Sequence, residues 1–101
     1  MNVIENNQYD NPDEFYQSLK EKLDNNYDFP QDYLFKFIME NNPNKLAEIY
    51  QIFDEIHHTL SNRESKNGKY ISTSINAFVL NSDHVIELYK KVGKIEGVMM
   101  L

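Results

Sequence analysis

The sequence contains no cysteine, and it has only three glycines among its 101 residues. Without cysteine the chain has no disulfide framework, no thiolate metal site and no thiol nucleophile. The glycines at Gly68, Gly93 and Gly97 are too scattered to build a phosphate-binding loop or a dinucleotide-binding fingerprint. At this length one domain with a single core is expected, and several common classes of enzyme and redox protein are excluded.

Long apolar runs are missing as well. The longest, Ala77–Leu80 and Val98–Leu101, are far shorter than the roughly 20 residues that a membrane span needs. Residues 1–10 are acidic and rich in asparagine, without the basic and apolar regions of an export signal. We therefore expect a cytoplasmic protein that does not insert into a membrane.

Positive charge is scarce. The chain has 10 Lys and Arg residues and 16 Asp and Glu residues, which gives a net charge of −6. Phosphate-backbone binding depends on clustered cations, so we expect no nucleic-acid partner. Residues 1–32 hold eight acids and two lysines, whereas residues 33–101 hold eight acids and eight bases. We expect a flexible acidic tail over residues 1–10, an appended helix over residues 11–28 and a folded domain over residues 29–101.

Three segments have the spacing of amphipathic helices. Residues 11–25 open on Asn11–Glu14, where an N-cap amide precedes a proline at the first helical position. A second helix follows Asn42–Pro43, and a third is expected to be capped by Ser82 and ended by a left-handed Gly93. The apolar stripes are Leu46, Ile49, Tyr50, Phe53 and Ile56 in the second helix and Val85, Leu88, Tyr89 and Val92 in the third.

Four segments are predicted to be strands. Residues 33–39 have one strongly apolar face and one mixed face, and residues 69–80 alternate strictly. Asn67–Gly68 predicts a type I′ hairpin, in which both residues adopt positive φ. The weakly patterned residues 57–66 before it suit an edge strand, and the apolar residues 95–101 form a last strand.

The order of these elements predicts an α+β, ferredoxin-like βαββαβ fold, preceded by one extra helix. Such a chain closes as a four-stranded antiparallel sheet with two helices on one face. Right-handed crossovers place the first and third strands at the centre of the sheet. The second face of the sheet remains uncovered.

This uncovered face is the main candidate for function. Alternation places apolar and hydroxyl side chains on it, and an apolar patch on neighbouring strands is typical of an interface. The alternative interpretation is an ordinary solvated face of an antiparallel sheet. The candidate binding residues are Leu34, Lys36, Ile38, Tyr70, Ser72, Ser74, Asn76 and Met99.

Few residues offer catalysis or metal binding. His57 and His58 are consecutive, so their side chains diverge, and we expect neither a metal site nor a cofactor. Arg63 is the only arginine. A small hydrolase or transferase that uses His84 or Arg63 with a carboxylate is the enzymatic alternative to a non-catalytic module.

Several segments resemble the YbeD-like family of small bacterial proteins, a family of unknown function. The resemblance covers Phe29–Leu101, and its most specific part is the hairpin over residues 66–72. Gly93–Glu96 and Phe29–Pro30 add to it. It implies a ferredoxin-like fold similar to the ACT regulatory domains, which bind small metabolites and are often dimers. It implies no established reaction.

The chain departs from this family near the end of the first predicted strand. The resemblance implies a glycine at this position, and this chain has Met39. A glycine would let a ligand approach the backbone closely. Met39 therefore argues against carrying an ACT-type amino-acid site over to this chain.

These observations predict a non-catalytic regulatory or binding module that acts through protein contacts or metabolite-responsive dimerisation. The expected partners are another protein, a second copy of the chain or a small metabolite, met by the open face or a strand edge. A further hypothesis is that the acidic helix over residues 11–25 docks a basic partner.

Overall fold

The computed structural model describes residues 12–101, so the acidic tail expected over residues 1–10 and the expected cap Asn11 lie outside the described residues. Within this range the chain forms three helices and four strands. The helices are α1 (Pro12–Asn26), α2 (Pro43–Phe53) and α3 (Ser82–Gly93), and the strands are β1 (Gln31–Glu40), β2 (His58–Glu64), β3 (Tyr70–Val79) and β4 (Met99–Met100).

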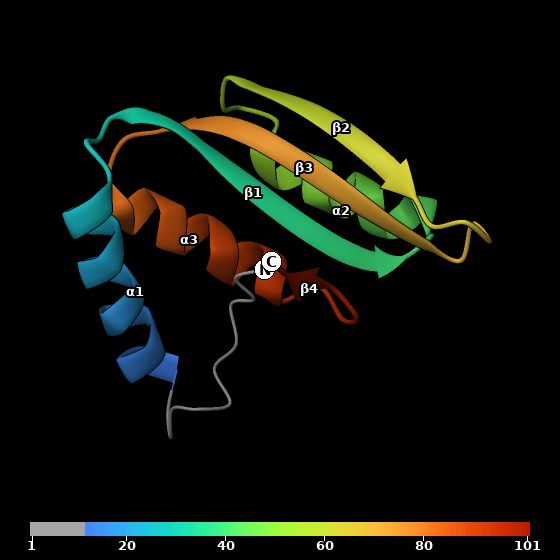
Figure 1. Cartoon of the computed structure of the whole chain (residues 1–101), viewed down its shortest axis with the longest axis horizontal. Coiled ribbons are helices and arrows are strands. Elements are labelled where there is room, and N and C mark those ends of the chain that lie inside the picture. The colour runs from blue at the N-terminus through green and yellow to red at the C-terminus, as the bar shows by residue number, and fades with distance from the viewer. Residues whose placement is uncertain (1–11) are drawn as a thin grey trace.

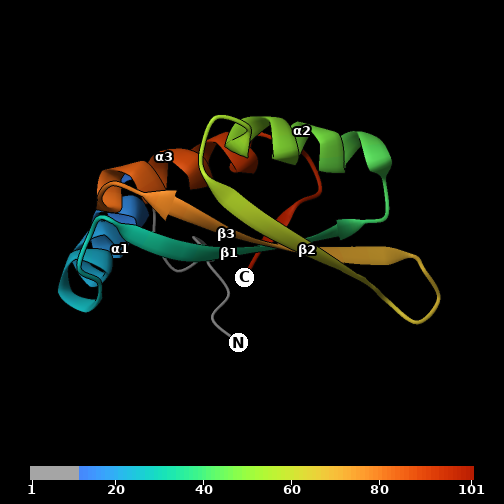
Figure 2. The ribbon, with the colours of Figure 1, turned by 90° about the horizontal axis from the view of Figure 1, so that it is seen from above.

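The strands form one antiparallel sheet in the order β2-β3-β1-β4. β1 and β3 pair along their whole length, from Gln31 opposite Val79 to Glu40 opposite Tyr70. The predicted ferredoxin-like arrangement, with the first and third strands at the centre, is confirmed. Figure 2 shows α2 and α3 on one face of the sheet, and no helix of the described chain covers the other.

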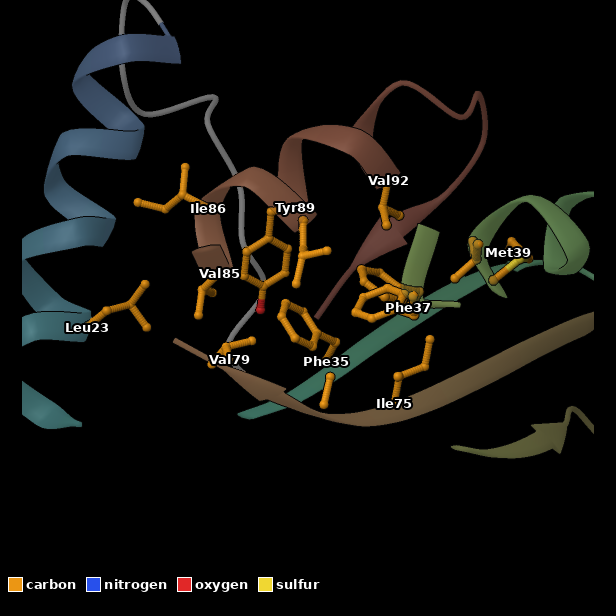
Figure 3. Packing of buried hydrophobic residues seen from close by; sticks show 14 of the residues in the cluster. Leu23, Phe35, Phe37, Met39, Ile75, Val79, Val85, Ile86, Tyr89 and Val92 are labelled. Atoms are coloured by element: carbon orange, nitrogen blue, oxygen red, sulfur yellow. The ribbon is translucent and has the colours of Figure 1, made fainter. Parts of the chain in front are cut away.

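The core lies between the sheet and these two helices, as Figure 3 shows. Phe35, Phe37 and Met39 of β1 are buried on the helix side because alternate strand residues share a face. Tyr89 of α3 meets Phe35 edge to face, with 5.1 Å between the ring centroids. The strongly apolar face of β1 is therefore the floor of the core.

α1 packs beside α3 at one end of the molecule (Figure 1). Its Leu23 is only 3% exposed and joins the core cluster. The Lys20 ammonium donates to the Ser82 hydroxyl at 3.0 Å and lies 3.3 Å from the Asp83 carboxylate. Apolar burial and polar contacts with the start of α3 together hold α1.

The ends of α3 differ from the prediction. Asn81, not Ser82, is the N-cap, and its side-chain oxygen accepts a hydrogen bond from the His84 N–H at 2.8 Å. The Ser82 hydroxyl is instead buried and bound by Lys20. Gly93 supplies no left-handed stop, because the helix ends on a right-handed Lys94. Capping preferences do not separate neighbouring Asn and Ser residues, and a distant lysine occupies the serine.

The β2-β3 hairpin forms, but the type I′ turn is wrong. Gly68 has φ +72°. Asn67 does not have a positive φ, because no non-glycine residue within residues 12–101 does. The Gly68 N–H donates to the Ser65 carbonyl, and the Asn67 side chain accepts from the Lys69 N–H at 3.0 Å. The hydrogen bond from the Lys69 N–H to the Asn67 side chain favours a four-residue loop over residues 66–69 instead of the two-residue turn.

The last strand is shorter than predicted. β4 comprises only Met99–Met100, and residues 95–98 lead into it as a turn. Gly97 has φ +82°, which interrupts an extended backbone. Apolar character predicted the strand over residues 95–101 correctly only at its end.

Candidate functional site: the open face of the sheet

The open face is the side of the sheet opposite α2 and α3. The register places Leu34 opposite Asn76 and Lys36 opposite Ser74. The side chains that share this face by register are Leu34, Lys36 and Ile38 of β1, Tyr70, Ser72, Ser74, Asn76 and Phe78 of β3, Thr59, Ser61 and Arg63 of β2, and Met99 of β4.

The eight residues proposed from the sequence are thus brought together on one surface. Ile38 lies at the middle of one row, with Ser72 on one side and Met99 on the other. Arg63 extends the same row on β2, because it pairs with Ser72. Figure 2 shows this side of the sheet without a covering helix.

The face exposes large apolar side chains. Met99 is 56% exposed, Leu34 53%, Tyr70 44% and Phe78 40%. Leu34 and Phe78 lie toward one end of the face and Met99 and Tyr70 toward the other, so apolar area is exposed at both ends of this surface. The alternation along β3 also places Phe78 on this face, although Phe78 is not among the eight residues predicted from the sequence.

Polar groups occupy the middle and the β2 side of this face. The Ser72 hydroxyl donates to the Arg63 carbonyl at 3.4 Å, and Ser74 lies between Ser61 and Lys36 in the neighbouring row. The contribution of β2 was missed because its sequence has no clear alternation. Only its pairing with β3 assigns Thr59, Ser61 and Arg63 to the open face.

His84 and Arg63, each considered for catalysis together with a carboxylate, lie in different parts of the fold. His84 accepts the Leu80 N–H on its Nδ1 at 3.1 Å, so this nitrogen is engaged at the start of α3. Arg63 pairs with Ser72, which is eight residues before Leu80 and therefore roughly 26 Å away along an extended strand. Within residues 12–101, no three His, Cys, Asp or Glu side chains lie close enough to hold a metal ion.

Two tyrosines form a polar pair at the edge of the core. The hydroxyl groups of Tyr33 and Tyr89 are 3.1 Å apart, and burial raises the pKa of both. Both hydroxyls therefore stay protonated near neutral pH. They lie on the helix side of the sheet and take no part in the open face.

The fold and this face define a class: a small α+β domain with ferredoxin-like topology and one sheet surface that none of the helices within residues 12–101 covers. A family model described as "Protein of unknown function (DUF493)" matches residues 24–101, and the chain belongs to this family. None of the curated proteins matches the chain. In the part that the structure describes, no helix has the length and apolar character to cross a bilayer.

One of the similar solved structures, protein HP0495, shares the fold. Protein HP0495 from H. pylori has a TM-score of 0.60 and 22% sequence identity, over 74% of this chain and 85% of that chain. The ACT domain from the GTP pyrophosphokinase of Chlorobium tepidum has a TM-score of 0.49 and 18% identity, over 70% of this chain and 100% of that chain.

Proposed function

We propose that this chain is a non-catalytic binding module of the bacterial cytoplasm that works as a homodimer, joined along the outer edge of β2. The observation that carries the proposal is this edge itself. β2 is seven residues long and lies at the end of the sheet, and none of the described strands pairs with its outer side. In Figure 1 it is the outermost strand.

The backbone groups that face outward follow from the hydrogen bonds to β3. The Phe78 N–H donates to the His57 carbonyl, and the Ser65 N–H donates to the Tyr70 carbonyl. Hydrogen-bonded and non-hydrogen-bonded pairs alternate along an antiparallel ladder. The backbone N–H and C=O groups of the odd-numbered residues of β2 therefore point toward β3. The even-numbered residues direct their N–H and C=O groups outward; they are His58, Leu60, Asn62 and Glu64.

A second copy fits this edge in one favoured register. A two-fold axis that passes between Ser61 of one copy and Ser61 of the other pairs the whole of β2 with its own copy. This register allows about eight backbone hydrogen bonds. The same register places Glu64 opposite His58 of the second copy. Arg63 then faces a neutral Thr59, so no like charges lie opposite each other.

The middle of this edge lacks the usual protection against pairing. Residues 59–62 of β2 contain no charge and no proline, the two devices that commonly block an exposed strand. Leu60 is 42% exposed, which adds apolar area at the contact. Pairing would extend the open face across both copies into one larger binding surface.

The enzymatic alternative requires His84 or Arg63 to work with a carboxylate. General acid–base or nucleophilic catalysis requires the participating groups within hydrogen-bond reach of one substrate. His84 is engaged by the Leu80 N–H, and none of the ion pairs within residues 12–101 includes Arg63. The absence of a carboxylate ion pair at either residue within residues 12–101 supports the proposed non-catalytic role.

Disulfide trapping tests the dimer directly, because the chain has no cysteine of its own. In the proposed register the two Ser61 residues form a non-hydrogen-bonded pair, with Cα atoms about 4.5 Å apart, which a disulfide can span. We expect Ser61→Cys to give a covalent dimer under mild oxidation. Ser74→Cys, one strand further in, is the matched control and stays monomeric, because its two copies lie about 14 Å apart.

Sedimentation measurements complete the test. We expect a wild-type dimer, and a monomer for Leu60→Pro, which removes one outward N–H without touching the ladder to β3. Circular dichroism checks that the variant is folded. A wild type that remains monomeric at millimolar concentration, or equal crosslinking of the two cysteine variants, would refute the proposed dimer.

A further inference from the structure

A shallow pocket of about 210 Å³ lies on the open face, where the hairpin joins the sheet. It is smaller than the roughly 300–1,000 Å³ of sites for drug-sized ligands, so only a small molecule fits. Ile38, Ser72 and Arg63 form one cross-strand row of the sheet, and Tyr70 flanks this row. The residues that line the pocket are Ile38, Arg63, Glu64, Ser65, Tyr70, Ile71 and Ser72.

The pocket has an apolar part. Ile38 is half-buried in the sheet, and the exposed ring of Tyr70 stands at the side. Neither group offers a charge, so this part of the pocket suits a short aliphatic or aromatic body. A flat ring against Tyr70 and Ile38 gains contact area at little entropic cost.

The charged part of the pocket is Arg63. None of the ion pairs formed within residues 12–101 uses its guanidinium. The planar fork of N–H donors matches a carboxylate in a two-point geometry. The Lys69 ammonium lies 5.5 Å from the centroid of the Tyr70 ring and adds positive charge at the same end.

The hairpin is a local exception in an acidic protein. Residues 63–70 hold Arg63, Lys66 and Lys69 against one acid, Glu64, whereas the whole chain has a net charge of −6. The net positive charge of the hairpin attracts a small anion to this end of the open face.

We propose that the pocket between Arg63, Ile38 and Tyr70 binds a small monocarboxylate with an apolar or aromatic body. The carboxylate pairs with the guanidinium, the Ser72 hydroxyl turns its proton from the Arg63 carbonyl to the carboxylate, and the body covers Ile38 beside Tyr70. The Glu40 side chain shares the open face opposite Tyr70, so a dianion such as phosphate meets more repulsion than a monocarboxylate. This inference goes beyond the proposed dimer, because the pocket lies within one copy.

Titration of ¹⁵N-labelled protein with benzoate tests the site. We expect saturable shifts of the Ile38, Arg63 and Ser72 amides at millimolar benzoate. Benzamide has the same ring without the charge, and inorganic phosphate has the charge without the ring. Both are expected to bind at least about tenfold more weakly, because each lacks one of the two recognised parts.

A pair of variants separates the pocket from the general charge of the protein. Arg63→Gln and Lys94→Gln each remove one positive charge, but Lys94 is an exposed residue that does not line the pocket and lies off the open face. We expect Arg63→Gln to weaken benzoate at least about tenfold and Lys94→Gln to leave it within about twofold. The amide spectrum of each variant shows whether it is folded.

Equal weakening by the two variants, equal binding of phosphate, or shifts confined to other residues would overturn the inference. The result is independent of the dimer test, since disulfide trapping at Ser61 requires no ligand. A failed titration therefore leaves the proposed dimer standing, and a failed trap leaves the pocket standing.

Discussion

Two leucines offer a matched test of which face of the sheet is buried. Leu23 of α1 is 3% exposed and belongs to the core cluster, whereas Leu34 of β1 is 53% exposed on the open face. Leu23→Ala and Leu34→Ala remove the same atoms. Any difference between their effects on the free energy of unfolding reports the surroundings of the side chain.

The expected magnitudes differ severalfold. Leu23→Ala loses the transfer free energy of a buried side chain and leaves a cavity where α1 meets α3, which costs about 2–5 kcal/mol. Leu34→Ala leaves no enclosed cavity and removes a side chain that is already half in water. We expect it to cost about 0.5 kcal/mol or less.

Urea unfolding of both variants at low micromolar protein concentration gives these free energies. The dependence on urea should be unchanged, since neither substitution alters the surface exposed on unfolding by much. A cost above about 1.5 kcal/mol for Leu34→Ala would mean that another part of the protein covers the open face. A cost below about 1 kcal/mol for Leu23→Ala would contradict the packing of α1 into the core.

Three further predictions follow from local features. Asn81→Ala should lower the free energy of unfolding by about 1 kcal/mol through loss of the N-cap of α3, measured by urea unfolding; no loss would mean that Asn81 is not the cap. Gly68→Ala should cost about 1–2 kcal/mol, because φ at this residue is +72°, and thermal melting will show whether the loop tolerates it. Burial raises the pKa of Tyr33 and Tyr89, so the unfolded state loses protons first and stability falls as the pH rises above about 10. Unfolding curves between pH 8 and 11 should show this fall, and Tyr33→Phe with Tyr89→Phe should flatten it; an unchanged slope would argue against the buried pair.

Much of the fold could be predicted because the relevant signals are local. Alternation along β1 separated the buried Phe35 and Phe37 from the exposed Leu34 and Lys36, since strand side chains point to opposite faces in turn. The order of the elements then predicted the strand order of the sheet, because right-handed crossovers leave few topologies open. The open face followed from the same alternation.

The incorrect details depend on contacts that a local pattern does not contain. Lys20, more than 60 residues away in the chain, binds the Ser82 hydroxyl, and this leaves Asn81 to cap α3. The side chain of Asn67 accepts hydrogen bonds within its own loop and favours a longer turn than the Asn-Gly pair predicts. Preferences at neighbouring positions are close in free energy, so a single tertiary contact decides between them.

By itself, the sequence determined the helices, the strands, their order and the side of β1 and β3 that faces water, because hydrophobic periodicity reports which side of an element is buried. The tertiary structure decided what lies next to what: α1 against α3, Arg63 beside Ile38 and Tyr70, and the even-numbered residues of β2 at a free edge. The physical reason is that register between strands is a long-range choice. A slip of one residue would move every side chain of β2 to the opposite face, and only the pairing with β3 excludes it.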